Sequence, residues 1–218
     1  MQAFTTLNKH NKQHTRQIQP GCVFCKGKKN IELFSSKNFF VMFDESPLLN
    51  GHLIIASKEH IGCAGELSFE LLMELEKVRE KTTDLLLQSY GKICFFEHGR
   101  AGHCVSFSYD ERLCHHFHMH ALPFAKDIID ILKKRFNYII LKKYVDINSF
   151  FDRYGDYFYF ESFERKKYFF PVQTDIESHL LRTVIAKKIG HPERADWKKY
   201  ENYQMIKDAK KILKKSLL

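Results

Sequence analysis

His115-His116-Phe117-His118-Met119-His120-Ala121-Leu122-Pro123 is the stretch of sequence on which the prediction of this fold rests. From position 116 to position 121 histidine alternates with an apolar residue, and a period of two is typical of a β-strand. The three alternating histidines are then expected on one face, roughly 6.6 Å apart, while the apolar residues enter a core. The strand should end at the proline, which has no N–H to donate to a neighbouring strand. A row of imidazoles on one face favours a site for an anion or a metal ion.

Length and composition bound the class of protein. The 218 residues suit one domain with an extension or two small domains, and a hydrophobic content of 44% supports a sizeable core. Twenty phenylalanines and ten tyrosines predict that this core is unusually aromatic. The formal net charge of +9 favours anionic partners such as nucleotides, nucleic acid or acidic protein. No uninterrupted apolar run reaches ~18 residues, so no transmembrane helix and no membrane partner are expected.

The N-terminal segment and the cysteines indicate a cytoplasmic protein. Residues 1–20 are polar, and we expect a basic flexible tail here and not a secretory signal. Without an export signal, the six cysteines are expected to be reduced thiols or metal ligands. Cys22-Val23-Phe24-Cys25 is a C-x-x-C motif, which indicates metal or redox chemistry. A redox motif normally opens a helix after a strand, whereas this one follows a polar segment, so zinc is favoured.

The remaining pattern predicts an α+β fold with an antiparallel sheet and one long helix. Ser68 is a good N-cap and Gly91 a good helix end, so the long helix should span Phe69–Tyr90. Further strands are expected at Phe39–Phe43, His52–Ala56, Ile93–Glu97, Tyr138–Leu141, Tyr157–Phe160 and Tyr168–Phe170. Further helical segments are expected at Asp127–Phe136, at Ile176–Ile189 before Gly190, and after Pro192 toward the C-terminus.

The pattern His116-Phe117-His118-Met119-His120-Ala121-Leu122 resembles the signature of the histidine-triad (HIT) superfamily of nucleotide hydrolases and transferases. The resemblance covers roughly residues 22–123. In that superfamily the middle histidine attacks the α-phosphate of a nucleotide and becomes transiently nucleotidylated. The resemblance therefore implies that His118 is the nucleophile and that His120 stabilises charge on the phosphoryl oxygens.

A metal site follows from the residues and from the resemblance together. The C-x-x-C motif supplies two thiolates, and two histidines can complete a Cys2His2 tetrahedron. Zinc-bearing HIT relatives take one histidine after the second strand and the first histidine of the triad. The matching residues are Cys22, Cys25, His60 and His116. Four protein ligands close the site, so the zinc is predicted to be structural. Cys63 is the alternative to His60.

The resemblance also implies a nucleotide pocket. The implied contacts are Phe43, Asp44, His52, His98, Gly99 and Arg112. Asp44 would bind ribose hydroxyls, and His52 would support the triad. Many relatives carry Asn-x-Gly in the stretch that holds His98 and Gly99, and Gln-Ser where Arg112 and Leu113 stand. Arg112 can compensate for the lost polar groups by pairing with a phosphate.

The C-terminal part is similar to the C-terminal domain of the CwfJ-like HIT proteins, which are associated with spliceosome and lariat-debranching complexes. This similarity rests on Phe170-Pro171-Val172-Gln173, Arg182-Thr183-Val184 and Ala195-Asp196-Trp197-Lys198. We therefore expect a HIT-like catalytic domain with a zinc knuckle over residues 21–125. Residues 126–218 should form an extension packed on it.

These observations lead to one prediction of function and two alternatives. The chain is predicted to be a zinc-stabilised hydrolase or transferase acting at a nucleotide α-phosphate. Its substrate would be a purine nucleotide conjugate: a dinucleoside polyphosphate, a phosphoramidate or an adenylylated nucleic-acid end. The first alternative is a non-catalytic RNA- or protein-binding module, and the second is a redox C-x-x-C protein. RNA and a second copy of the chain are further partners that this interpretation admits.

Overall fold

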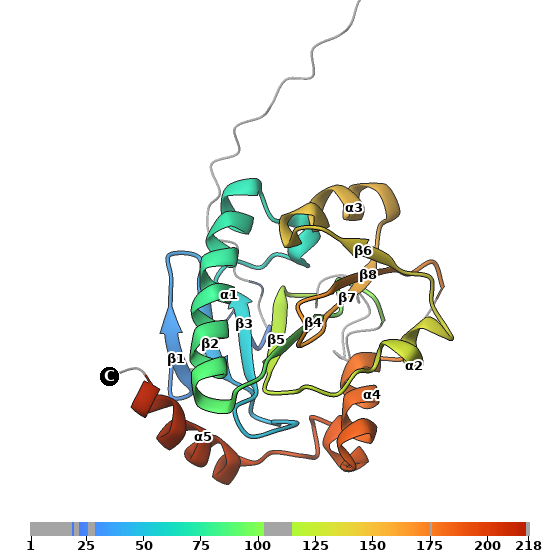
Figure 1. The fold of residues 1–218 in the computed structure, drawn as a ribbon. Helices are drawn as coiled ribbons and strands as arrows, with labels where there is room; N and C mark the ends of the chain where they lie inside the picture. The colour runs from blue at the N-terminus through green and yellow to red at the C-terminus, as the bar shows by residue number, and fades with distance from the viewer. Residues whose placement is uncertain (1–18, 20–21, 26–28, 103–114, 175, 217–218) are drawn as a thin grey trace, which may run out of the picture.

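Short, mostly apolar runs form the strands of one antiparallel sheet in the computed structural model. The structure describes residues 19, 22–25, 29–102, 115–174 and 176–216. The eight strands lie in the order β1-β2-β3-β5-β4-β7-β8-β6, and every neighbouring pair is antiparallel. The strands are β1 (Glu32–Ser35), β2 (Phe39–Phe43), β3 (Leu53–Ser57), β4 (Cys94–Glu97), β5 (His118–Leu122), β6 (Ile139–Leu141), β7 (Tyr157–Glu161) and β8 (Lys167–Pro171). The predicted α+β class is confirmed (Figure 1).

The long helix α1 (Phe69–Tyr90) begins and ends where its caps predict. The Ser68 hydroxyl accepts a hydrogen bond from the Leu71 N–H at 3.3 Å, which satisfies one of the free donors of the first turn. At the other end Gly91 has a left-handed φ of 69°, which glycine adopts without a steric penalty. Figure 1 shows α1 in front of β2 and β3, running roughly along these strands.

The two faces of the sheet carry different cores. On β5, Met119 and Ala121 pack into the core that includes the buried side of α1, as their alternation predicts. His120 faces the other way and stacks on Phe96, with ring centroids 4.3 Å apart. Phe96 belongs to a second core, which also contains residues of the helices α2 (Ile129–Lys133) and α4 (Leu180–Ile189). The histidine face of the sheet is therefore covered by the C-terminal half of the chain.

The C-terminal half also extends the sheet itself. Strand β7 pairs with β4 on one side and with β8 on the other, and β6 forms the edge. The helix α5 (Tyr203–Ser216) crosses back to α1 and places Ile206, Ala209 and Leu213 in the core on the α1 side. The strands from both halves form one sheet, while the division of the chain at residue 125 stays a prediction.

Several element boundaries differ from the prediction. Helix α4 begins at Leu180 and not at Ile176, because His179 adopts a left-handed φ of 57° just before it. Helix α2 covers only the middle of the predicted segment 127–136. Helix α3 (Ile147–Tyr154) and strand β1 were not predicted. Short 3-10 turns lie at Ala64–Glu66, Tyr144–Asp146 and Pro192–Ala195.

Candidate functional site

Two cysteines and two histidines from separate segments meet in one cluster. Cys22, Cys25, His60 and His116 each offer one ligand atom, and these atoms all lie within 4.8 Å of one another. His116 Nδ1 lies 3.4 Å from Cys22 Sγ and 3.6 Å from Cys25 Sγ. His60 Nδ1 lies 3.4 Å from Cys25 Sγ and 3.2 Å from His116 Nδ1. The four residues predicted as metal ligands are thus brought together.

These separations fit a tetrahedral metal ion. Zinc bonds of ~2.3 Å to sulfur and ~2.0 Å to nitrogen place S and N about 3.5 Å apart and two N atoms about 3.3 Å apart. The Nε2–H of His116 donates to the Ser57 carbonyl at 2.8 Å, which leaves the lone pair of Nδ1 facing the thiols. Histidines bound to metals are usually oriented by such a second hydrogen bond. The chain therefore carries a Cys2His2 cluster able to hold a metal ion.

Cys63, the alternative ligand, is not a member of this cluster. Its side chain lies in the core on the α1 side and is fully buried. Burial raises the pKa of the Cys63 thiol, because a thiolate would lose its hydration there. The structure therefore favours His60 over Cys63 as the fourth ligand.

His118, at the start of β5, has one ring nitrogen that makes no hydrogen bond to the residues that the structure describes. Its Nδ1 lies 2.8 Å from the carbonyl oxygen of His116. Only an N–H can make that contact, so Nδ1 carries the proton and Nε2 keeps its lone pair. The ring of Phe24 stacks on the His118 imidazole, with centroids 4.7 Å apart at 22°, and holds it in place. Burial lowers the pKa of His118, so the ring is neutral at pH 7.

His120, two residues along, has the opposite polarity, meaning that its Nδ1 is unprotonated and its Nε2 carries the proton. The Leu48 N–H donates to His52 Nδ1 at 3.1 Å, so the proton of His52 is on Nε2. That Nε2 lies 2.9 Å from His120 Nδ1, which must therefore accept. The remaining nitrogen of His120, Nε2, carries a proton. Burial lowers the pKa of His52 to about 4 and that of His120 well below its usual range, so both rings stay neutral.

A cleft opens beside His118, which lies on its wall. The other lining residues are Gly62, Glu97, His98, Gly99, Arg100, Ala101, Gly102, His115, His116 and His179. A Cβ atom on Gly99 would lie 2.4 Å from the ring of Tyr157, and Gly99 has a φ of 46°, so this position requires glycine. The Arg100 guanidinium forms ion pairs with Glu66 and Asp156 at the same edge. The cleft thus combines an unprotonated imidazole nitrogen, a glycine turn and a guanidinium that two carboxylates already pair.

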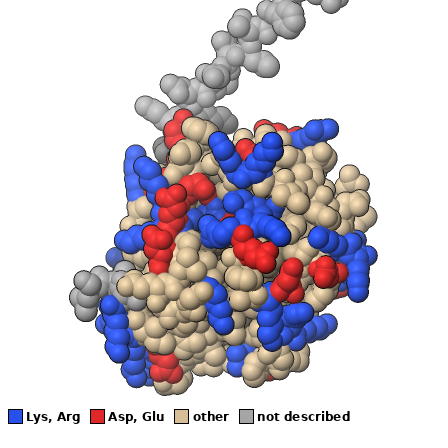
Figure 2. Space-filling model, viewed as in Figure 1, with Lys and Arg blue, Asp and Glu red and all other residues tan. Residues whose placement is uncertain are grey.

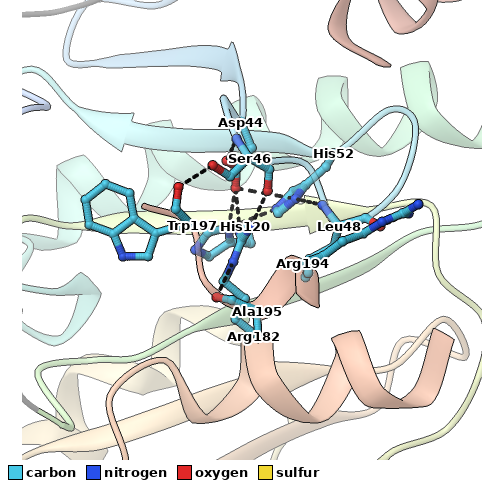
Figure 3. Close-up of polar contacts among 9 residues, drawn as sticks. All are labelled: Asp44, Ser46, Leu48, His52, His120, Arg182, Arg194, Ala195 and Trp197. Carbon is cyan, nitrogen blue, oxygen red and sulfur yellow. Dashed lines mark hydrogen bonds and ion pairs between the residues drawn. The ribbon is translucent and has the colours of Figure 1, made fainter. Parts of the chain in front are cut away.

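The predicted ribose ligand Asp44 lies in a closed polar network beneath this region (Figure 3). Asp44 Oδ2 is 3.1 Å from a guanidinium nitrogen of Arg182, which reaches it from α4. Asp44 Oδ1 accepts from the Ser46 N–H at 2.8 Å. Arg182 also donates to the carbonyls of Ser46 and Ala195. Asp44 and Arg182 are both buried, so each neutralises the charge of the other out of contact with water.

The structure separates the predicted nucleotide contacts into three groups. His98 and Gly99 line the cleft together with His118. Asp44 and His52 belong to the closed network, and Phe43 is buried in the core on the α1 side. Arg112 lies outside the described residues. A nucleotide contact for each of these residues stays a prediction.

A family model described as "Protein similar to CwfJ C-terminal" matches residues 8–137 of the chain. The chain belongs to this family. The match confirms the predicted relation to CwfJ-like HIT proteins. It ends at residue 137, so the CwfJ-like similarity of the segments from Phe170 onward stays a prediction.

Solved structures similar to this CwfJ-related chain include three that are described as HIT or histidine triad proteins. A HIT family protein from Bacillus anthracis is 17% identical, with a TM-score of 0.39 over 52% of this chain and 86% of that one. A hypothetical histidine triad nucleotide-binding protein from Sulfolobus tokodaii is 18% identical, with a TM-score of 0.36 over 49% and 70%. A HIT family hydrolase from Clostridium thermocellum is 21% identical, with a TM-score of 0.33 over 50% and 94%. No curated protein matches the chain.

Three residues of the candidate site were not predicted as site residues. Arg182 lies within a segment noted for its CwfJ-like similarity, but no sequence signal connects it to Asp44, which is 138 residues earlier. Arg100 directly follows His98 and Gly99 in the chain, and His179 lines the cleft from the C-terminal half. In the part of the chain that the structure describes, no helix has the length and apolar character needed to cross a membrane.

Proposed function

We propose that this chain is a nucleotidyl hydrolase or transferase in which His118 attacks the α-phosphorus of a nucleotide conjugate. The observation that carries the proposal is the opposite polarity of two histidines on one strand. His118 Nε2 holds a lone pair and can act as the nucleophile. His120 Nε2 holds a proton and can donate a hydrogen bond to a phosphoryl oxygen as negative charge develops there.

The reaction has two steps. The lone pair of His118 Nε2 forms a bond to phosphorus, while the bond from phosphorus to the leaving group breaks and leaves its electron pair on that group. Water or another acceptor then attacks the nucleotidyl-histidine and loses its proton, and His118 regains its lone pair. Arg100 and the glycines of the cleft stand beside His118, where phosphate oxygens would lie. Arg112 is a further predicted phosphate contact.

For the cluster of Cys22, Cys25, His60 and His116 we propose zinc with a structural role. Thiolates and imidazoles are the ligands that zinc prefers, and four of them leave no position open for water. Bound there, the metal would cross-link the C-x-x-C segment to the residues just before β5. His116 is thereby kept out of the chemistry, and His118 is the residue of the triad left to attack phosphorus.

We propose a purine nucleotide conjugate as the substrate, with Phe43, Asp44, His52, His98 and Gly99 as its contacts. Two conditions follow from the structure. Phe43, which is buried in the core on the α1 side, has to become exposed to reach a nucleotide. A ribose hydroxyl that reaches Asp44 has to compete with Arg182 and with the Ser46 N–H for the carboxylate.

A second candidate function is a non-catalytic RNA- or protein-binding module. The engaged carboxylate of Asp44 favours it, because a closed ribose site suits a domain that has no turnover. The charge distribution does not favour RNA binding. Figure 2 shows Lys and Arg spread over the visible face with Asp and Glu among them. That face has no single basic patch of the kind that follows a nucleic-acid backbone.

The test is to trap the covalent intermediate. The full chain is mixed with diadenosine tetraphosphate, quenched and measured by intact mass, alongside His118→Asn. We expect an added adenylyl group on the wild-type chain, none on His118→Asn, and a fall in turnover of several orders of magnitude. His191→Asn, at an exposed histidine paired with Glu193, is the matched control and should behave as wild type. An adduct on a folded His118→Asn chain, or no adduct and no turnover by wild type, would overturn the proposal.

A further inference from the structure

A second hollow adjoins the cleft of His118 and shares one residue with it. It is open to solvent, has a volume of about 290 Å³ and is lined by Ser178, His179, Thr183, Ala195, Asp196, Trp197 and Lys198. His179 lines both the hollow and the cleft, so its ring stands between them. A ligand that passes His179 can therefore place one end beside His118 and the other in the hollow.

Trp197 forms a fixed aromatic wall of this hollow. Its indole N–H donates to His179 Nε2 at 3.1 Å, and its carbonyl oxygen accepts from the Ser46 hydroxyl at 2.6 Å. The side chain is nevertheless 38% exposed, so part of the ring remains open to a ligand. An indole held at both its ring and its backbone loses little conformational freedom when a ligand stacks on it, which favours binding.

The polar groups around the ring suit a nucleotide. His179 Nε2 accepts from the indole, so the proton of this imidazole is on Nδ1. Lys198 Nζ lies 5.7 Å from the centre of the Trp197 ring and supplies positive charge. Thr183 and Ser178 contribute hydroxyls to the wall. A flat aromatic surface beside a cation and hydrogen-bonding groups is how proteins hold a nucleobase with its phosphate.

The backbone at His179 supports the same interpretation. This residue has a left-handed φ of 57°, a conformation that costs a non-glycine residue free energy. The conformation places the ring against Trp197 on one side and 6.2 Å from the ring of His98 on the other. The strained residue is thus the one that joins the two hollows.

We propose that the hollow around Trp197 binds the nucleobase in the leaving half of the substrate, while His118 attacks the other half. This inference rests on the proposed function and narrows its substrate class to conjugates that carry a second base. Such a base belongs either to a dinucleoside polyphosphate or to an adenylylated nucleic-acid end. A phosphoramidate, which has no second base, would leave the hollow empty.

Binding is tested by fluorescence, because Trp197 is the single tryptophan of the chain. The full chain is titrated with a methylene-bridged diadenosine tetraphosphate, a 5′-adenylylated oligonucleotide and adenosine 5′-phosphoramidate. We expect the emission of Trp197 to be quenched by a probe with a second base and not by the phosphoramidate. Quenching by the diadenosine analogue alone indicates a dinucleoside polyphosphate, and quenching by the oligonucleotide alone indicates an adenylylated nucleic-acid end. Equal quenching by the phosphoramidate, or none by either probe with a second base, would overturn the inference.

Enzyme kinetics provide a second test of the base site. Stacking is worth ~1–3 kcal/mol per base, so Trp197→Ala should lower kcat/KM for diadenosine tetraphosphate by about 5- to 150-fold. Turnover of the phosphoramidate should change less than about 2-fold, and Trp197→Phe should restore most of the loss, on the same reasoning. Tyr203→Ala, at another exposed aromatic residue, is the matched control. Equal losses for both substrates would mean that Trp197 has only a structural role.

The two proposals fail in different ways. If wild type turns over neither substrate but the probes with a second base still quench Trp197, the enzymatic proposal fails and the base site stands. If wild type turns over both substrates and Trp197→Ala does not discriminate between them, the base site fails and the enzymatic proposal stands.

Discussion

Three histidines two residues apart differ in which ring nitrogen is available, and in each case a neighbour decides. Ser57 accepts from Nε2 of His116, so Nδ1 faces the cysteines. The carbonyl of His116 accepts from Nδ1 of His118, which frees Nε2. His52 donates to Nδ1 of His120 and leaves a proton on Nε2. The sequence predicts the positions of these rings, but their tautomers depend on contacts made by folding.

The metal cluster can be tested one residue at a time. Purified protein should contain about one zinc per chain by elemental analysis, and Cys22→Ser or Cys25→Ser should lose it and melt at a lower temperature. Cys63→Ala is the control, because Cys63 lies in the core and outside the cluster. It should lower the melting temperature and keep the metal. Stoichiometric zinc in a Cys22/Cys25 double variant would contradict the assignment.

The buried ion pair gives a second prediction for single residues. Arg182→Met leaves the Asp44 carboxylate buried without its partner, which should cost about 3–5 kcal/mol of the free energy of unfolding. Combining Arg182→Met with Asp44→Asn should recover a large part of that loss, because the uncompensated charge is removed. Denaturant unfolding of the four proteins completes a double-mutant cycle. Strictly additive losses would show that the two side chains do not interact.

At the scale of elements, local sequence patterns predicted the ends of the long helix correctly. They did not predict which charged residues are buried by contacts with distant strands. The bounds of α1 follow from Ser68 and Gly91 and are correct. The buried side of α1 nevertheless includes Arg79, whose guanidinium pairs with Glu161 of β7 and lies 3.9 Å from the ring centre of Tyr144. From the sequence alone, a charged residue such as Arg79 is expected to be exposed to solvent. Its burial becomes predictable only when its partner on a distant strand is known.

Helix α5 supplies a prediction for one element. Its sequence is rich in lysine, yet its apolar residues Ile206, Ala209 and Leu213 pack in the core on the α1 side. Leu213→Ala should cost about 2–5 kcal/mol of the free energy of unfolding, the usual loss for a buried leucine. Ile212→Ala, one residue away and 37% exposed, is the matched control and should cost much less. Similar losses for both variants would contradict the docking of α5.

At the scale of the whole molecule, the candidate site lies between the sheet and the C-terminal half. β7 joins the sheet beside β4, and α4 carries Arg182 and follows His179 on the histidine face. These contacts join residues far apart in the chain, and no local pattern specifies such a pairing. The predicted extension therefore proved to be part of the site, because Arg182 and His179 come from it.

The same burial makes the stability of the whole fold depend on pH. Burial lowers the pKa of His52 and of His179 to about 4, and those of His98 and His120 well below the usual range. In the unfolded chain these rings titrate near ~6.5, so below that pH the unfolded state binds more protons than the folded state. Their contribution to stability is therefore complete above pH ~6.5 and is lost as the pH falls toward the folded pKa values.

Glu97 acts in the opposite direction. Burial raises its pKa to about 7, so in the folded state it keeps a proton that the unfolded chain releases above ~4.5. Its contribution to stability is lost as the pH rises toward 7. Four histidines with lowered pKa values outweigh this single carboxyl group, and we expect the free energy of unfolding to fall between pH 7.5 and pH 5.

A variant at His52 isolates one part of this effect. His52→Gln can keep one accepting and one donating group but cannot be protonated in this range, so it should remove ~2 kcal/mol from the loss between pH 7.5 and pH 5. Metal release at low pH affects both proteins, because His52 lies outside the cysteine cluster, so it cancels in the comparison. Urea unfolding at pH 7.5, 6 and 5 gives the two slopes. The idea that buried neutral histidines make the fold sensitive to acid would be wrong if wild type and His52→Gln lost stability in parallel.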